Sequence, residues 1–146
     1  MPIKTDAIGK EWPGTTCQVG REKIKEYATA LGIDNPVHFE VEAARAAGFR
    51  DVVAPPMFAV VYSGPALGPV LFDPEVGMNF AAMVHGGQVF DWNEPVCSGD
   101  EITTTSKCLS IEEKDGKGFY VFETVSVNQE GAEVVRGTWT DIVRGV

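Results

Sequence analysis

Two histidines, His38 and His85, are the only side chains of this 146-residue chain whose ordinary pKa lies near neutral pH. They therefore limit where acid–base catalysis could occur. His38 follows Asp34 and Asn35 in a polar stretch, and His85 stands directly before Gly86. Both stretches also fit a purely structural role. Asp34 and Asn35 are types that favour turns, and the His38 ring could simply cap a backbone carbonyl. Gly86 after His85 suits a turn at the entry to a strand. Residue types alone leave both interpretations open.

Other kinds of chemistry find less support in the composition. Cys17, Cys97 and Cys108 are widely spaced and lack paired C-x-x-C ligand spacing, so we interpret them as reduced thiols and predict neither a metal site nor a cofactor. The formal charge of −9 argues against a nucleic-acid partner, because phosphate binding needs clustered Lys and Arg.

The length and the hydropathy pattern predict one ordinary domain over residues 1–146. The first residues lack the apolar centre of a signal peptide, and no apolar run approaches the roughly 18 residues of a membrane helix. We therefore expect a cytoplasmic protein without a membrane partner.

Two short helices should position the polar stretch around His38. Residues 20–32 carry an amphipathic stripe of Ile24, Tyr27, Ala28 and Leu31, and Gly32 should stop that helix. Residues 39–49 predict a second short helix that ends at Gly48. The polar turn between the two helices would hold the histidine.

A third, apolar helix should form the centre of the domain. Pro55 and Pro56 suit its first turn, because those positions need no backbone N–H. Residues 57–72 are apolar all round, which predicts burial on nearly every side. The Gly-Pro pairs at 64–65 and 68–69 should kink it, so we expect a straight helix only to about Ser63.

From residue 85 onward the apolar period changes to two. Residues 87–92, 101–111, 118–127 and 133–143 are rich in β-branched and aromatic types and are separated by turn signals, which predicts an antiparallel meander. In the last strand Val135, Trp139 and Val143 share the face that should pack against the core. The prediction is an α+β fold with a curved sheet wrapped around one apolar helix.

Three stretches carry a family resemblance: residues 34–58 (DNPVHFEVEAARAAGFRDVVAPPMF), residues 85–102 (HGGQVFDWNEPVCSGDEI) and the tail TWTDIVRG. With them, nearly the whole chain resembles the MaoC-like hydratases and dehydratases, especially the subset related to the dehydratase region of type I fatty acid synthase. The resemblance implies a hot-dog fold and a homodimer, or a heterodimer with a second hot-dog subunit. It also implies reversible hydration of a trans-2-enoyl thioester of coenzyme A or acyl carrier protein.

Catalytic members of that family carry the motif Asp-x-Asn-Pro-x-His and a His-Gly pair that opens the central helix. Asn35, Pro36 and His38 match the first motif, but Ile33 stands where the family has Asp, and Asp34 comes one residue late. The His-Gly pair falls on Pro55–Pro56, and proline has no N–H to donate to the thioester oxygen. Losing one such donor typically costs about 2.7–4 kcal/mol of transition-state stabilisation.

The departures from the motif favour a structural half of a two-subunit enzyme. An alternative is a self-sufficient homodimer that uses His38 with Asp34 for catalysis. Further alternatives are a non-catalytic acyl-thioester binding module and a thioesterase on the same fold. Candidate substrate-binding residues under these hypotheses are Asn35, Met57, Tyr62, His85 and Gly86. Met57 and Tyr62 also suit a simple core role.

Overall fold

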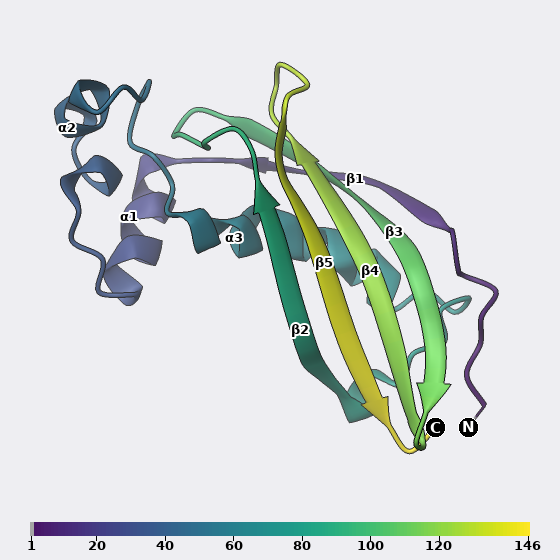
Figure 1. Cartoon of the computed structure of the whole chain (residues 1–146). Helices are drawn as coiled ribbons and strands as arrows, with labels where there is room; N and C mark the ends of the chain where they lie inside the picture. The colour runs from purple at the N-terminus through teal and green to yellow at the C-terminus, as the bar shows by residue number, and fades with distance from the viewer. Residues whose placement is uncertain (1) are drawn as a thin grey trace.

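The computed structural model describes residues 2–146 and shows an antiparallel sheet wrapped around a broken helix (Figure 1). Its strands are β1 (Glu11–Gln18), β2 (Met83–Trp92), β3 (Glu101–Lys114), β4 (Lys117–Val127) and β5 (Glu133–Arg144). Its α-helices are α1 (Arg21–Ala30), α2 (Val41–Ala46), α3 (Ala59–Ser63) and α4 (Gly68–Leu71). Short 3-10 turns are η1 (Pro36–His38), η2 (Pro56–Phe58), η3 (Gly64–Leu67) and η4 (Phe80–Ala82). The predicted α+β class is confirmed.

The sheet order is β1-β3-β4-β5-β2, with every neighbouring pair antiparallel. The predicted meander is correct for β3 to β5 but wrong for β2, which pairs with β5 rather than with β3. Strand β1 was not predicted, because Pro13 and Gly14 lie inside it and interrupt its pattern. An edge strand tolerates both residues, and the β1 register shifts between Trp12 and Thr15.

The central helix breaks where the Gly-Pro pairs predicted. Regular α-helix ends at Ser63, and a 3-10 turn over Gly64–Leu67 carries the chain into α4. Thr104 Oγ1 and Ser106 Oγ, on β3, each donate to a helix carbonyl at 3.3 Å. These hydroxyl groups fasten the irregular helix to the sheet at buried positions.

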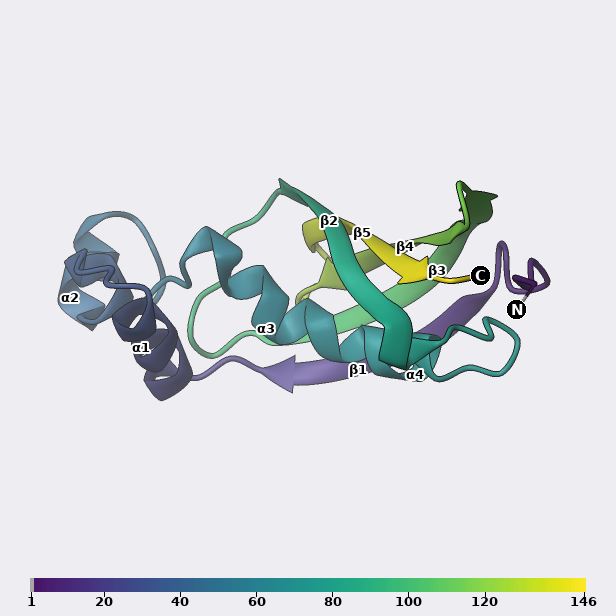
Figure 2. The ribbon, with the colours of Figure 1, turned by 90° about the horizontal axis from the view of Figure 1, so that it is seen from below.

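Burial of this helix is one-sided, contrary to the prediction of burial all round. Ala59 and Val70 have no exposed surface, whereas Val60 and Val61 are half-buried and Pro65 is exposed. Figure 2 shows the reason: the helical segment runs along one face of the sheet, so its far side is left uncovered. The sheet contributes Phe122, Val135, Trp139 and Val143 to the core, which confirms the predicted inner face of β5.

Helices α1 and α2 lie beyond the end of the sheet (Figure 1). Ile24 and Ala28 of α1 are buried as expected, but Leu31 is 56% exposed and does not continue the stripe. Leu31 lies just past the last helical residue, so its side chain leaves the buried face. Gly48 adopts φ +95° after α2, a conformation that favours glycine and ends the helix. Within residues 2–146, no helix is long and apolar enough to cross a membrane.

Candidate functional site

A cavity of about 730 Å³ opens where the α1–α2 region meets the end of the sheet. Its wall is mostly apolar, with Val37, Phe49, Val53, Ala54 and Val96 among the lining residues. Cavities of this size and polarity, with a few polar groups, are typical of small-molecule sites. Side chains with polar atoms reach the wall from three segments: Asn35 and His38, then Tyr62, then Trp92, Asn93 and Glu94.

Local hydrogen bonds shape the turn that holds His38. The Asn35 side chain accepts the Val37 N–H at 3.2 Å, as an N-cap residue does, and Pro36 begins the short 3-10 turn. The Val53 N–H donates to the Val37 carbonyl at 3.0 Å. The turn is thereby tied to the segment that leads into the central helix.

The His38 ring has one nitrogen in use and one free for a ligand. Its Nδ1 lies 2.6 Å from the Val53 carbonyl oxygen, and because a carbonyl only accepts, Nδ1 carries the proton. Nε2 is then the nitrogen available toward the cavity. In the described part of the chain, no carboxylate hydrogen-bonds to this ring, and Asp34 is exposed and does not line the cavity. The structure does not bring the predicted His38–Asp34 pair together there.

The two prolines form part of the cavity wall at the start of the central helix. The Pro56 carbonyl accepts the Nε1–H of Trp92 at 2.8 Å, which ties the helix start to the end of β2. Neither proline has a backbone N–H to offer a ligand. At the start of the central helix, the cavity wall therefore has no backbone N–H at Pro55 or Pro56 that could donate to a thioester oxygen.

Of the two predicted binding residues on the central helix, only Tyr62 lines the cavity. Its side chain is 3% exposed, and burial raises the pKa of its hydroxyl group. Its ring packs at 6.1 Å from the Phe58 ring, which meets the Tyr27 ring edge-on at 5.5 Å. Met57 is 44% exposed and is not part of the cavity wall.

His85 and Gly86 lie on β2, outside the cavity lining. His85 Nδ1 is 3.4 Å from Asp141 Oδ1 on β5, and its ring meets the Trp139 ring at 5.8 Å. Burial raises the pKa of Asp141, and the nearby imidazole lowers it less. The two predicted binding residues therefore belong to the β2–β5 pairing.

Replacing Gly86 should show that this glycine serves packing. A Cβ atom there would lie 2.5 Å from Ile142 Cδ1, at the register shift between β2 and β5. We expect Gly86→Ala to lower the free energy of unfolding by about 1–3 kcal/mol, the usual range for overpacking. Gly87→Ala is the matched control, since its Cβ would meet Thr140 at an ordinary 3.6 Å. Equal urea midpoints of unfolding for the two variants would contradict a packing role for Gly86.

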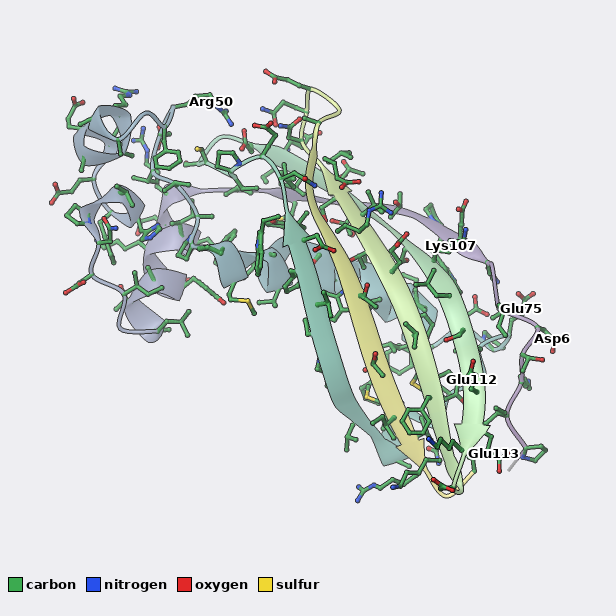
Figure 3. The ribbon with its side chains drawn as sticks, in the orientation of Figure 1. Asp6, Arg50, Glu75, Lys107, Glu112 and Glu113 are labelled. Atoms are coloured by element: carbon green, nitrogen blue, oxygen red, sulfur yellow. The ribbon has the colours of Figure 1, made fainter. Side chains whose placement is uncertain are left out.

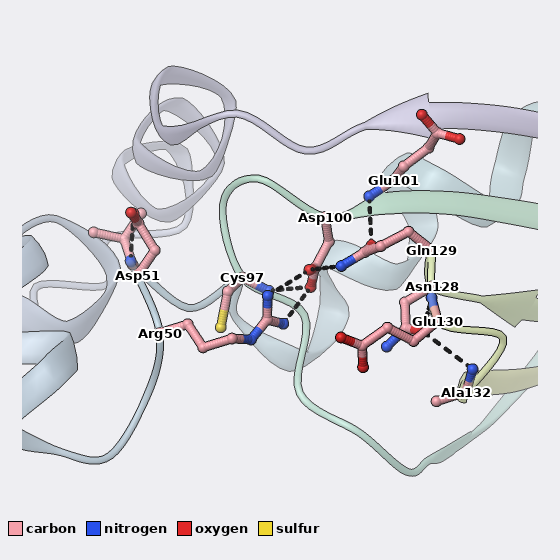
Figure 4. A network of polar contacts seen from close by, with 10 residues as sticks. Arg50, Asp51, Cys97, Asp100, Glu101, Asn128, Gln129, Glu130 and Ala132 are labelled. Atoms are coloured by element: carbon pink, nitrogen blue, oxygen red, sulfur yellow. Dashed lines mark hydrogen bonds and ion pairs between the residues drawn. The ribbon is translucent and has the colours of Figure 1, made fainter.

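An ion pair between exposed Arg50 and buried Asp100 was not predicted from the sequence, where Asp100 suits a plain turn. Asp100 is fully buried and accepts bonds from Arg50 Nη1 (2.8 Å), Arg50 Nη2 (3.0 Å), the Cys97 N–H (2.9 Å) and Gln129 Nε2 (3.0 Å), as Figure 4 shows. Burial alone raises the pKa of Asp100, but these donors outweigh it and hold the pKa below its ordinary value. The pair joins two loops that also line the cavity.

The charged residues are unevenly placed around the molecule. Figure 3 shows Arg50 at the end of the sheet near α2, whereas Glu112, Glu113 and Asp6 lie toward the opposite end. Acidic residues also lie near the cavity, since Glu94 is in its wall and Glu40 and Glu42 belong to the α2 segment.

Comparisons with known proteins agree with this arrangement. Residues 6–136 match the family model "FAS1-like, dehydratase domain region". A UPF0336 protein of Clavibacter michiganensis is 39% identical over 146 residues, covering 99% of this chain and 98% of the relative. A UPF0336 protein of Saccharopolyspora erythraea is 38% identical over 146 residues, with 99% and 94% covered.

Solved structures extend the likeness to three dimensions. The HadBC (3R-hydroxyacyl-ACP dehydratase) complex of Mycobacterium tuberculosis contains a chain with a TM-score of 0.83 and 28% identity, covering 96% of this chain and 99% of that one. The R-hydratase PhaJ1 of Pseudomonas aeruginosa shares the fold, with a TM-score of 0.74, 18% identity and coverage of 99% and 90%. The predicted hot-dog fold is confirmed. The chain belongs to the FAS1-like dehydratase region family, among the MaoC-like hot-dog proteins.

Proposed function

We propose that this chain is the structural half of an acyl-thioester hydratase/dehydratase. The enzyme would hydrate a trans-2-enoyl thioester of coenzyme A or acyl carrier protein reversibly to the 3-hydroxyacyl thioester. A second hot-dog subunit with an intact Asp-x-Asn-Pro-x-His motif would supply the catalytic residues. This chain would supply sheet, interface and an apolar cavity for the acyl group.

One observation carries the proposal: the cavity keeps the motif's histidine but lacks the groups that would make it a catalyst. Hydration needs an acid–base pair for the proton and the water, and a donor for the thioester oxygen as negative charge develops. The His38 ring is bonded to a backbone carbonyl, and the helix start is Pro55–Pro56. The mostly apolar wall nevertheless suits an acyl chain.

The free edge of the sheet supports pairing with another subunit. β2 forms one edge, and three apolar residues on it are exposed: Val84 (42%), Val89 (56%) and Trp92 (48%). An uncovered strand with exposed apolar side chains offers its backbone groups to a second chain. β1, at the other edge, carries Pro13 and Gly14 and a register shift, features that discourage such pairing.

The role of His38 tests the proposal within the assembled enzyme. We expect His38→Ala to change kcat for crotonyl-coenzyme A hydration by less than about tenfold. The same substitution at the partner's motif histidine should lower kcat by about 10²–10⁴, the usual contribution of general acid–base catalysis. Steady-state kinetics on both complexes compare the two histidines directly. A larger loss from His38→Ala than from the partner's variant would refute the assignment of roles.

The second candidate is a self-sufficient homodimer, favoured by the uncommitted Nε2 of His38 at the cavity. In that case a carboxylate from another segment would have to approach the ring on assembly. The homodimer candidate requires full hydratase activity from the single purified chain, abolished by His38→Ala.

A further inference from the structure

The cavity contains few side chains able to donate a hydrogen bond to a ligand. The Trp92 Nε1–H is used by the Pro56 carbonyl at 2.8 Å, and Asn93 Nδ2 donates to Glu133 Oε2 at 2.9 Å. His38 Nδ1 is bonded to the Val53 carbonyl. Two side-chain donors in the wall have no acceptor among residues 2–146: the Asn35 amide and the Tyr62 hydroxyl.

These two donors differ in their surroundings. Asn35 is exposed, so water can satisfy its amide. Tyr62 is 3% exposed as a residue, and its ring is held against Phe58. A buried tyrosine hydroxyl normally has a hydrogen-bond partner. The Tyr62 hydroxyl has no partner among the described residues and is not among their fully enclosed unpaired atoms, so it keeps access to the mostly apolar cavity that the residue lines. A ligand that brings an acceptor oxygen into this cavity can supply the missing partner.

We propose that the Tyr62 hydroxyl donates a hydrogen bond to the carbonyl oxygen of an acyl thioester held in this cavity, in place of the N–H that Pro55–Pro56 cannot provide. The inference rests on the proposed function for the class of ligand. The acyl chain would then lie against apolar wall residues such as Val53 and Val96. This hydrogen bond would serve binding rather than turnover, because none of residues 2–146 places a carboxylate on the His38 ring.

The chemistry of the phenol suits this role. Burial raises the pKa of Tyr62, so the hydroxyl keeps its proton throughout the neutral range and acts as a donor. A carbonyl oxygen is an acceptor, whereas the sulfur of a thioether is a poor one. The site should therefore distinguish a thioester from a thioether with the same alkyl chain.

Binding of two unreactive probes to the full chain tests the inference. Hexanoyl-coenzyme A and S-hexyl-coenzyme A differ at the carbonyl group, and neither can be hydrated. By isothermal titration calorimetry we expect the wild-type chain to bind the thioester about two- to tenfold more tightly, the range of one neutral hydrogen bond. Tyr62→Phe should abolish that preference while retaining binding of the thioether.

Tyr27→Phe is the matched control, because it also removes one phenol hydroxyl but Tyr27 does not line the cavity. It should keep the wild-type preference. Equal wild-type affinities for the two probes, or a Tyr62→Phe variant that still prefers the thioester, would overturn the role of Tyr62 and leave the proposed function standing. If the chain binds neither probe, alone or with its catalytic partner, the acyl-thioester function of the cavity is overturned as well.

Discussion

The purified chain alone is expected to hydrate crotonyl-coenzyme A at least about a hundredfold more slowly than its complex with a hot-dog subunit that carries the intact motif. One missing oxyanion donor typically costs about 10²–10³ in rate, and here Pro55–Pro56 removes it. The absence of a carboxylate at His38 adds to that loss, because the imidazole lacks the second member of the acid–base pair.

Three samples make this comparison: the chain, the second subunit, and both together at equal concentration. The expected result is a kcat that reaches its full value only in the mixture. A self-sufficient enzyme would instead show full activity in the first sample and none after His38→Ala. Size-exclusion chromatography of the mixture reports whether the complex forms, which separates a failure to pair from a failure to react.

Replacing Arg50 with methionine is expected to lower the free energy of unfolding by about 2 kcal/mol, because it leaves the buried Asp100 carboxylate without its countercharge. The value lies below that of a fully buried pair, since the Arg50 side chain is 60% exposed and the Cys97 N–H and Gln129 still donate to Asp100. Arg21→Met is the control, since Arg21 is exposed to a similar degree (57% against 60%) and also pairs with an aspartate. Asp51 keeps 17% of its side-chain surface in contact with solvent, so we expect a loss below about 1 kcal/mol there.

The pH dependence gives the same prediction a second readout. The pKa of Asp100 is lowered in the folded chain, so its ionised form stabilises the fold above its ordinary pKa, and that contribution is lost as the pH falls. Without Arg50, burial favours the protonated carboxyl group. The stability difference between wild type and Arg50→Met should therefore narrow as the pH falls through about 4, the ordinary pKa of Asp, beginning above that value in the variant and continuing below it in the wild type. Urea unfolding at pH 7 and pH 3.5 measures it, and a constant difference would contradict the assignment.

Local sequence signals anticipated most of the secondary structure. The period-two stretches became β2 to β5, and the Gly-Pro pairs ended α3 at Ser63. β1 was missed because Pro13 and Gly14 resemble a turn, and they are tolerated only through a sheet-edge position that no local pattern reveals. The pairing of β2 with β5 was equally hidden, because it joins strands that are distant in sequence.

In the candidate site, too, the sequence predicts some residues correctly, whereas the placement of others depends on the fold. Residue types and the family motif predict His38, Asn35 and Tyr62 as site residues, and all three line one cavity. The same signals predict His85 and Gly86, but these residues lie elsewhere, because the pairing of β2 with β5 places them beside Asp141 and Ile142. Asp100 gave no functional signal in sequence, since its partner Arg50 is fifty residues away.

By itself, the sequence determined that proline occupies the start of the central helix and that isoleucine replaces the motif's aspartate, since these are covalent facts that no folding can change. It also determined the helix breaks and the inner face of β5, because these depend on local backbone restraints and on the period of side chains. Only the tertiary structure decided which polar groups face the same cavity and which are already paired. Such pairings depend on contacts between distant segments, whose geometry local patterns do not encode.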